Sequence, residues 1–330
     1  MKVLVTGATG AIGPRVVHAL HQAGYQIRAF SVDTPAAGIF PQRVEVLIGD
    51  VTDQVAVQSA MQGVDAVVHM AALLHIVNPL PEMREKYERV NIGGTATVVE
   101  AGIKASVKRV VLFSTIAVYG PSDGCALNEL SPTQPDTFYA RTKFAAEQRV
   151  LNARRTDGQR LGTVLRLGAV YGSRIKGNYR RLTRALARHR FIPIGNGLNR
   201  RTLVYDKDVG RAAMLAVSHP AAAGRVFNVT DGGSHTLNEI IESICLALGR
   251  KPPRLSLPAG PTRKVISLIE KGSYAIGFKP PVTRDIINKY TEDIDVDGSL
   301  IQKEISFMPQ YDLKTGWRET VEEMRAMGDL

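Results

Sequence analysis

Short β-branched apolar runs alternate along this chain with longer stretches in which apolar residues recur every three or four positions. A short apolar run bounded by turn residues is typical of a buried strand, and the longer spacing indicates an amphipathic helix. The runs that predict strands are residues 2–6, 26–31, 44–48, 65–69, 109–114 and 226–230. The stretches that predict helices follow Gly13 and include residues 55–61, 91–95, 144–151 and 237–248, the last with a cap at Thr236.

The first strand leads directly into a glycine-rich turn and then into a helical pattern through Val16, Val17 and Leu20. Glycines allow a tight turn and a close backbone approach, and pyrophosphate binds against the free N–H groups at the start of such a helix. A strand, a glycine-rich turn and a helix in this order therefore predict a dinucleotide site. Its expected contacts in the turn are Gly7, Thr9, Gly10, Ala11, Ile12 and Gly13.

The ends of the following strands supply further expected contacts. An acidic residue at the end of the second strand would hydrogen-bond the ribose 2′-OH and favour NAD. Asp33 suits that role, whereas Ser31 at the strand end leaves room for a 2′-phosphate, so we expect NAD with NADP not excluded. Asp50 is placed to meet the adenine, and the small residues Ala71 and Ala72 let the cofactor pass close to the backbone.

A Tyr-x-x-x-Lys segment supplies the candidate chemistry. Residues four apart lie on one side of a helix, so Tyr139 and Lys143 are expected side by side. A neighbouring cation lowers the pKa of a phenol, which would let Tyr139 take a proton from an alcohol. Thr115 follows the strand 109–114, and its hydroxyl could hydrogen-bond the same substrate oxygen. His69 is expected to be packed at its strand end rather than catalytic.

The composition is that of an ordinary globular protein of 330 residues, with 44% hydrophobic and 22% charged residues. No run of about 18 apolar residues predicts a membrane span, and no signal-peptide pattern precedes the first strand. Cys125 and Cys245 form no spacing pattern, so neither disulfides nor a metal site are expected. A cytoplasmic location is the default expectation.

The net charge of +11 is concentrated in one part of the chain. No acidic residue lies between Asp157 and Asp206, a stretch that contains many arginines. Such a stretch is either a solvated basic face or a site for an anionic partner: a diphosphate-bearing substrate, a nucleic acid or an anionic membrane surface. The absence of interleaved aromatic residues argues against a nucleic acid.

Taken together, these segments resemble the extended short-chain dehydrogenase/reductases, in the group of NAD-dependent nucleotide-sugar epimerases, dehydratases and reductases. The resemblance rests on residues 3–13, 49–51, 69–72, 91–95, 113–120 and the Tyr139/Lys143 pair. It implies an α/β fold, a Rossmann-like doubly wound parallel sheet with a smaller C-terminal substrate-binding lobe. Residues 1–172 would form the NAD(P)-binding domain, with later strands at about 200–232 returning to it, and residues 173–330 mainly the lobe.

The resemblance also implies roles for individual residues. Thr115, Tyr139 and Lys143 would form the catalytic triad, and Arg201 would grip the diphosphate of a UDP-sugar. Ala169 stands where many members have an asparagine that contacts that diphosphate. Further expected cofactor contacts are Val51, Met70, Asn91, Ser114, Tyr139 and Lys143, and the expected substrate contacts are Thr115, Ala117, Arg174, Arg200 and Arg201.

Dehydratases of this type carry Asp-Glu after the threonine, and here Ile116 and Ala117 cannot move protons. The likeness therefore favours C4 epimerisation of a UDP-hexose or UDP-N-acetylhexosamine, in a protein expected to form homodimers. Three alternatives stay open: a 4-keto nucleotide-sugar reductase, a 3β-hydroxysteroid-type dehydrogenase, and a non-catalytic dinucleotide-binding protein. The segments 251–259 and 262–276, where substrate choice would be built, predict either a pocket wall or a lid.

Overall fold

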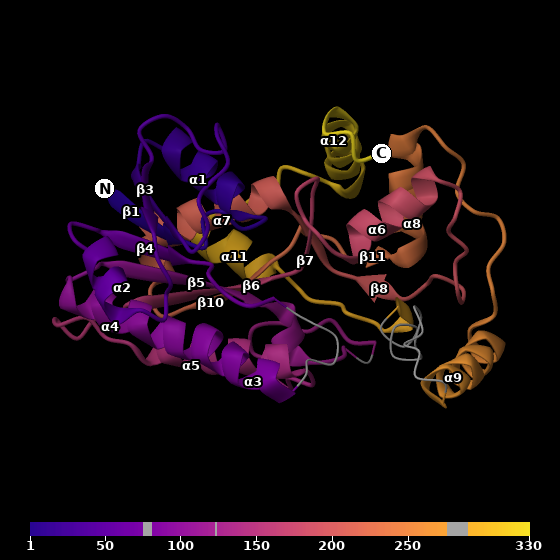
Figure 1. The fold of residues 1–330 in the computed structure, drawn as a ribbon, viewed down its shortest axis with the longest axis horizontal. Coiled ribbons are helices and arrows are strands. Elements are labelled where there is room, and N and C mark those ends of the chain that lie inside the picture. Colours follow the sequence, from indigo (N-terminus) through magenta and orange to yellow (C-terminus); the bar gives the residue numbers. More distant parts are fainter. Residues whose placement is uncertain (75–80, 123, 276–289) are drawn as a thin grey trace.

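The structure is a computed structural model that describes residues 1–74, 81–122, 124–275 and 290–330. A seven-stranded sheet, with strands in the order β10-β6-β5-β4-β1-β2-β3, forms its centre (Figure 1). All its strand pairs are parallel. The strands are β1 (Lys2–Thr6), β2 (Gln26–Ser31), β3 (Glu45–Ile48), β4 (Ala66–His69), β5 (Arg109–Thr115), β6 (Gly162–Leu167) and β10 (Val226–Val229). The predicted doubly wound parallel sheet is therefore confirmed, and each of the six predicted strands is present.

The sheet reverses its direction of growth at β1, which lies between β2 and β4. β2 and β3 extend the sheet on one side of β1, and β4, β5 and β6 extend it on the other. In open α/β sheets, ligands bind beyond the carboxyl ends of the strands at such a reversal point. The glycine-rich turn after β1 lies at this point, so the fold places the predicted dinucleotide site where a ligand crevice is expected.

Helices cover both faces of the sheet, and each face has its own apolar core. One core contains residues of α2, α4 and α5, and the other contains residues of α1, α7 and α11. The two layers are seen below and above the strands in Figure 1. The helices are α1 (Gly13–Gln22), α2 (Gln54–Ala60), α3 (Pro81–Tyr87), α4 (Gly94–Lys104), α5 (Phe138–Asn152), α7 (Asp206–Ser218) and α11 (Ser299–Ile305), with a π-helix η1 (Glu88–Gly93) and 3-10 turns η2 (Ile116–Tyr119) and η3 (Pro220–Ala222).

A smaller lobe packs around an aromatic core. The rings of Tyr171 and Trp317 stack with centroids 4.6 Å apart, and Tyr205 lies against Tyr171. A capping box between Thr236 and Glu239 begins the helix at 237–248, which confirms that prediction. The elements of the lobe are β7 (Ala169–Tyr171), α6 (Asn178–Ala187), β8 (Arg200–Arg201), β9 (Leu203–Tyr205), β11 (His235–Thr236), α8 (Leu237–Leu248), α9 (Ala259–Ala275) and α12 (Leu313–Ala326).

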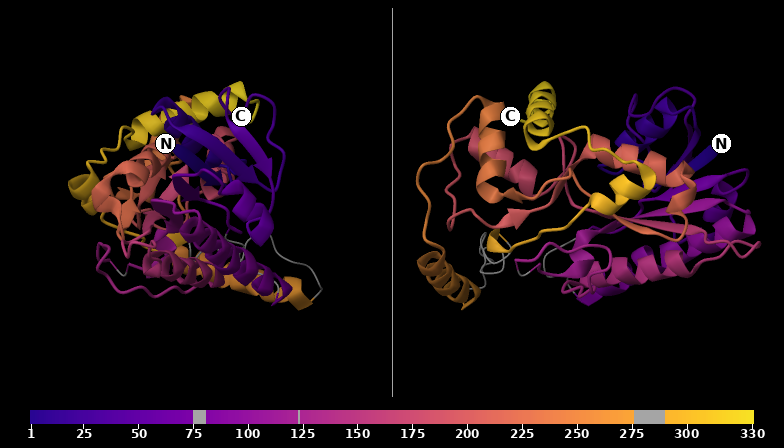
Figure 2. Two further views of the ribbon diagram at one scale, coloured as in Figure 1. Left: turned by 90° about the vertical axis from the view of Figure 1, so that its left-hand side faces the viewer. Right: turned by 180° about the vertical axis from the view of Figure 1, so that it is seen from behind.

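Helix α9 lies at the outer end of the lobe, away from the central sheet, as Figure 1 and the right-hand view of Figure 2 show. It occupies most of the segment 262–276 that the sequence left open, and residue 276 lies outside the described residues. Within the part of the chain that the structure describes, no helix is long and apolar enough to cross a membrane.

The first and last helices are joined through charged side chains. The guanidinium of Arg15 in α1 donates a 3.2 Å hydrogen bond from Nε to Asp206 at the start of α7. Its Nη2 donates a 2.5 Å bond to Glu323 in α12. Because Asp206 is fully buried, this contact fixes α1, α7 and α12 relative to one another.

Candidate cofactor and catalytic site

The turn after β1 adopts a conformation that requires glycine. Gly7 has a φ of +71°, and a Cβ on it would lie 2.8 Å from the backbone nitrogen of Ala71. A Cβ on Gly13 would lie 2.0 Å from the carbonyl oxygen of Ala8, so this glycine permits α1 to start close to the turn. No side chain caps the N-terminus of α1, whose N-cap residue is Ile12. At the start of α1 the N–H of Gly13 donates a 3.2 Å bond to the carbonyl of Gly10, and Pro14 has no N–H. The pyrophosphate contacts of this turn therefore stay a prediction.

The two candidate ribose contacts at the end of β2 differ in their surroundings. Ser31 is buried, and its hydroxyl accepts a 3.1 Å hydrogen bond from the backbone N–H of Thr9 in the glycine-rich turn. Asp33 is exposed to solvent, two residues beyond the strand. Ser31 therefore shapes the turn, whereas Asp33 is the side chain that is free to move toward a ribose. Both roles in cofactor binding stay predictions.

The two candidate cofactor contacts after β3, Asp50 and Val51, also differ in their surroundings. Asp50 is exposed and accepts a 2.9 Å hydrogen bond from the backbone N–H of Thr52, which holds the turn. The side chain of Val51 is buried in a sheet core, where a Cβ on Gly94 would lie 2.7 Å from its Cγ2. Any contact of Val51 with a cofactor therefore comes from its backbone. Sequence alone does not distinguish these two kinds of contact.

His69 ends β4 in a closed chain of hydrogen bonds, as the sequence predicted for a packed histidine. Its Nδ1 lies 2.7 Å from Oγ1 of Thr6, and its Nε2 lies 3.0 Å from Oγ1 of Thr95. Burial, together with the charge of Lys143, lowers the pKa of His69 to about 3. The imidazole therefore stays neutral across the physiological range and does not serve as a proton donor. It joins β1, β4 and α4 directly beneath the segment Met70, Ala71 and Ala72.

Asn91 lies in the π-helix η1, a rare backbone form that often occurs at functional sites. Its side-chain amide holds the backbone of Leu73, accepting a 2.8 Å bond from the N–H and donating a 3.2 Å bond to the carbonyl. It also donates a 3.0 Å bond to Oγ1 of Thr142 in α5. Asn91 therefore connects the loop after β4 with the helix of the catalytic candidates, one residue before Lys143. This positioning role adds to the cofactor contact that the resemblance implied.

The candidate base and its neighbour both lie in α5, four residues apart. Lys143 is only 3% exposed, and burial lowers its pKa to about 8. The ammonium is close enough to act on His69 at the end of β4, so the side chain reaches the carboxyl edge of the sheet. Tyr139 is half-buried, and its phenol lies near that of Tyr87.

The expectation that Lys143 lowers the pKa of Tyr139 is wrong for the protein as it stands. Burial, with a smaller contribution from Tyr87, raises the pKa of Tyr139 to about 12. Desolvation disfavours the charged form of both groups and is the largest cause of both shifts. In the resting protein the proton therefore belongs to Oη of Tyr139.

Glu147 of α5 joins that helix to β5 through a hydrogen bond and to β6 through a buried ion pair. Glu147, one turn after Lys143, receives a 2.6 Å bond from Nη2 of Arg166 and a 2.5 Å bond from the hydroxyl of Ser114. The next residue, Thr115, is half-buried, and its Oγ1 accepts a 3.2 Å bond from the backbone N–H of Ala117. Thr115, Tyr139 and Lys143 thus come from the facing ends of β5 and α5. The side chain of Ser114 is committed to Glu147, so a cofactor contact there falls to its backbone.

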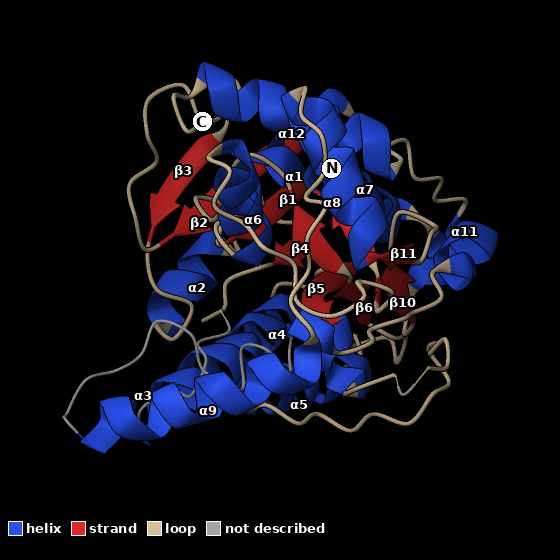
Figure 3. Cartoon of the chain, turned by 90° about the vertical axis from the view of Figure 1, so that its right-hand side faces the viewer, coloured by secondary structure: helices blue, strands red, loops and turns tan. Residues whose placement is uncertain are grey.

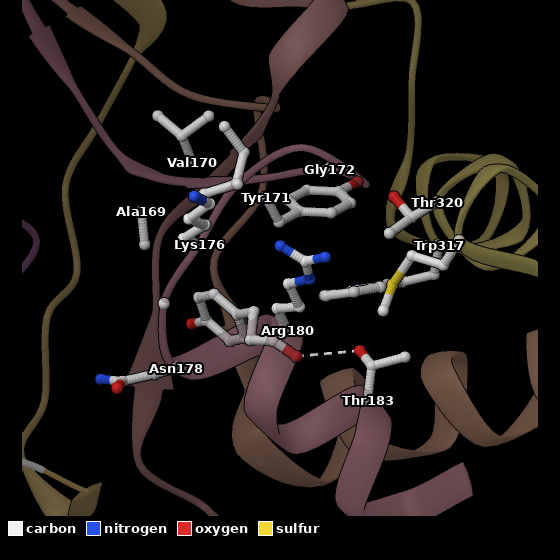
Figure 4. A pocket seen from close by; sticks show the side chains of 14 residues that line it. Ala169, Val170, Tyr171, Gly172, Lys176, Asn178, Arg180, Thr183, Trp317 and Thr320 are labelled. Carbon is white, nitrogen blue, oxygen red and sulfur yellow. Dashed lines mark hydrogen bonds between the residues drawn. The ribbon is translucent and has the colours of Figure 1, made fainter. Parts of the chain in front are cut away.

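A pocket of about 220 Å³ lies where β7, the following loop, α6 and α12 meet (Figure 4). Ala169, at the position where the resemblance leads one to expect an asparagine, lines this pocket with Lys176 and Asn178. In Figure 4 the guanidinium of Arg180 lies next to the ring of Tyr171. Lys176 and the start of α6 are candidate anion contacts that the sequence reasoning did not single out, although Gly177 before the helix was a visible signal.

The three candidate arginines lie in different environments. Arg201 is buried, donates a 3.2 Å bond to the carbonyl of Tyr290, and is near enough to α6 for its charge to oppose the raised pKa of Tyr179. Arg200 is exposed and bonds to Ser234 instead. Arg174 is half-buried after β7, and its Nε has no hydrogen-bond partner among the described residues. Of the three candidate arginines, Arg201 is thus the one that is buried beside α6.

Part of the acid-free stretch is neutralised by residues distant in the sequence. Arg166 pairs with Glu147, and both Arg180 and Arg184 pair with Asp329 near the C-terminus. These three arginines are structural. In the structure the arginines of this stretch therefore fall into two groups: those in internal ion pairs and those exposed to solvent.

A sequence model of the NAD dependent epimerase/dehydratase family matches residues 3–230. The chain is 28% identical, over 312 residues, to N-acetyl-alpha-D-glucosaminyl-diphospho-ditrans,octacis-undecaprenol 4-epimerase of Escherichia coli O157:H7, covering 94% of this chain and 87% of that protein. It is 27% identical, over 292 residues, to 3 beta-hydroxysteroid dehydrogenase/Delta 5-->4-isomerase of Mycobacterium tuberculosis strain H37Rv, covering 85% and 78%. The solved structure of MoeE5 in complex with UDP-glucose and NAD has 26% identity and a TM-score of 0.77, covering 99% of each chain.

Proposed function

The chain belongs to the NAD-dependent epimerase/dehydratase family, and we propose that it interconverts the C4 epimers of a hexose or N-acetylhexosamine carried on a diphosphate, with a UDP-sugar as the first candidate. The observation that carries this proposal is that Thr115 ends β5, while Tyr139 and Lys143 lie in α5, a helix that packs against β5. Ile116 and Ala117 follow Thr115 in place of an acidic pair. Without that pair, nothing at this position drives the loss of water.

NAD fits the residues at the reversal point of the sheet. The positive φ of Gly7 and the close contact of Gly13 with Ala8 leave space for a pyrophosphate to approach the backbone of the turn. When bound, NAD would accept the C4 hydride and give it back, chemistry that no side chain supplies. Lys143 would hold the adjoining ribose, and Asp33 the ribose of the adenosine half.

Three side chains would handle the C4 hydroxyl group. Thr115 Oγ1 would accept or donate a hydrogen bond to that oxygen and fix its direction. Tyr139 Oη, as the phenolate, would remove the hydroxyl proton while the C4 carbon is oxidised, and would return it when the 4-keto sugar is reduced from its other face. Because the resting pKa of Tyr139 is about 12 and that of Lys143 about 8, Lys143 must keep its proton for the phenolate to be stabilised.

The diphosphate would be held at the start of α6. Arg201 is a buried cation beside α6, and its planar group pairs with two phosphate oxygens at once. Lys176 and the backbone N–H groups of Asn178 and Tyr179 lie at the same helix start. A grip on the diphosphate alone leaves the sugar free to turn over between the two hydride transfers. The names of the related 4-epimerase and of the UDP-glucose complex share this sugar-diphosphate chemistry, which supports the proposal.

A 3β-hydroxysteroid-type dehydrogenase is the second candidate. Ala117 and Ala169 make the expected substrate side less polar than a sugar site usually is, and a steroid dehydrogenase is among the relatives. Such an enzyme would use the same Thr115, Tyr139 and Lys143. It would have no use for a buried arginine such as Arg201 beside α6.

The proposal is tested by incubating the purified protein with UDP-glucose, and separately with UDP-N-acetylglucosamine, without added cofactor, and analysing the sugars by NMR. The C4 epimer is expected to form, because the cofactor is regenerated in every turnover. Tyr139→Phe should bind NAD as well as the wild type and lose about 10²- to 10⁴-fold in turnover, the usual contribution of a general base. Normal turnover in that variant would remove Tyr139 from the mechanism.

Failure of both sugars, with and without added NAD, would refute the epimerase proposal for UDP-linked substrates. Reduction of a 4-keto nucleotide sugar by NADPH would then identify a reductase. Oxidation of a 3β-hydroxysteroid in the presence of NAD would identify the second candidate.

A further inference from the structure

Large apolar side chains are exposed in three segments at the outer end of the lobe. They belong to the loop after α6, to the segment before α9 and to α9 itself. Their exposed fractions lie between 45% and 81%. They are Ile192, Leu198, Leu255, Leu257, Val265 and Ile269, and they are called the outer apolar patch below. An exposed apolar group of this kind on a water-soluble surface is a candidate contact surface.

Backbone contacts hold the parts of the outer apolar patch together. Ile194 and Leu257 are bridge partners, and the N–H of Gly195 donates a 2.8 Å bond to the carbonyl of Leu257. Ile192 and Leu255 each lie two residues before those bridge partners. α9 begins at Ala259, directly after this pairing. The loop, the segment and the helix form the right-hand end of the molecule in Figure 1, which Figure 3 shows face-on.

The two sides of helix α9 lie in different environments. Val265 and Ile269 are four residues apart, lie on the same side of the helix and are exposed. Arg263, by contrast, donates a 2.7 Å bond to Oγ1 of Thr291 in the body of the lobe, and Ile266 is half-buried. The side of α9 that bears Val265 and Ile269 therefore faces away from the part of the protein that the structure describes. Lys264, next to Val265, is exposed as well.

Exposed cations accompany the outer apolar patch. In the described ranges of the chain, none of them takes part in an ion pair, unlike Arg180 and Arg184. They are Arg188, Arg190, Lys251, Arg254 and Lys264. They account for part of the +11 charge that the internal ion pairs do not explain. Apolar side chains flanked by lysines and arginines complement the headgroup region of an anionic bilayer, where each such cation contributes about 1 kcal/mol.

We propose that the outer apolar patch and its cations attach this protein to the surface of an anionic lipid membrane. The attachment is peripheral: Val265 and Ile269 enter the boundary between headgroups and acyl chains, and the cations meet lipid phosphates. A nucleic-acid site stacks bases on exposed aromatic side chains, whereas Phe191, the aromatic residue next to Arg190, packs against the core of the lobe. This inference goes beyond the proposed function and does not depend on it.

The patch adjoins the expected substrate side of the molecule. A pocket of about 510 Å³ lies at the base of α9, lined among others by Asn199, Ser256, Ala259 and Thr291. Asn199 is two residues before Arg201, the expected diphosphate contact. A protein docked through α9 would therefore hold this pocket close to the membrane surface, where a membrane-borne substrate would be within reach.

Vesicle flotation with the full chain tests the proposal. The wild type should float with vesicles of equal parts phosphatidylglycerol and phosphatidylcholine, and stay in solution with phosphatidylcholine alone. Raising the salt from about 0.05 M to about 0.5 M should release most of it, because screening weakens the cation contribution. Val265→Glu and Ile269→Glu should each lower the bound-to-free ratio at least about tenfold. Val55→Glu, which places the same charge at a 76% exposed valine of α2, should not change it.

Three results would overturn the proposal. The first is no flotation with anionic vesicles, and the second is flotation that Val265→Glu and Val55→Glu reduce equally. The third is a change of oligomeric state in Val265→Glu, measured by analytical ultracentrifugation without vesicles, together with unchanged flotation, since the patch would then contact a second copy. Circular dichroism and turnover of soluble UDP-sugar in the same variants separate this result from misfolding and from a failure of the proposed function.

Discussion

Lys143 is buried, and burial disfavours its charged form. It is 3% exposed in the unliganded protein, and Glu147, the nearest acidic residue along α5, is already engaged by Arg166 and Ser114. Burial lowers the pKa of Lys143 from an ordinary 10.5 to about 8. Replacement by methionine, of similar length and without charge, should therefore stabilise the unliganded protein while it removes turnover.

The size of the effect follows from the two pKa values. In the unfolded chain Lys143 titrates at its ordinary value, so near pH 7 the fold loses roughly 3 kcal/mol by keeping the group charged. That penalty is present below about pH 8 and is relieved as the pH rises toward 10.5, because only the unfolded chain still binds the proton there. The advantage of Lys143→Met should therefore be about 3 kcal/mol near pH 7 and about half of that near pH 9.5.

Urea unfolding at both pH values measures this difference. Lys104→Met, at an exposed lysine of α4, is the matched control and should stay within about 0.5 kcal/mol of the wild type. A Lys143→Met protein that is less stable than the wild type near pH 7, or whose difference from it does not change with pH, would refute the burial of an unfavourable charge. A gain in stability with full turnover would instead remove Lys143 from the catalytic site.

Two further predictions each compare two residues of the same type that lie in different environments. Gly7→Ala should abolish NAD binding, measured by calorimetry, because its methyl group would lie 2.8 Å from the Ala71 nitrogen. Gly24→Ala is the control, since Gly24 has a similar φ of +82° and open space around it. This variant should keep NAD binding and lose only about 1 kcal/mol of stability. Arg201→Ala should raise KM for a UDP-sugar about tenfold or more with a smaller change in kcat, and Arg200→Ala should have little effect; equal KM values in the two variants would place the diphosphate elsewhere.

Sequence reasoning succeeded where the signal is local. The strand at 2–6, the glycine-rich turn after it and the helix capped by Thr236 were predicted with nearly the observed bounds, since each depends on residues a few positions apart. The packed state of His69 followed from its place at a strand end. The parallel sheet followed from the order of the elements and from the family resemblance.

The remaining features depend on residues that are distant in sequence. Nothing near Arg180 indicates that Asp329, at the far end of the chain, neutralises it. The pKa of Tyr139 was predicted in the wrong direction, because the sequence shows the neighbouring Lys143 but does not show the burial of both groups. The exposure of Val265 could not be predicted either, since an apolar helix face by itself predicts a core position.

The contact of Arg15 with Asp206 and Glu323 has a consequence for folding during synthesis on the ribosome. The ribosome releases α1 early, yet the carboxylates that hold it are made some 190 and 300 residues later. Strand β10 and helix α11, which complete one edge of the sheet and its covering layer, are equally late. The nascent nucleotide-binding half therefore has an unfinished sheet edge until β10 emerges, and Arg15 lacks its second carboxylate partner until α12 emerges. Synthesis in the cell must keep this intermediate from pairing with its neighbours, and in a chain that stops before α12 the first helix keeps its bond to Asp206 and lacks the one to Glu323.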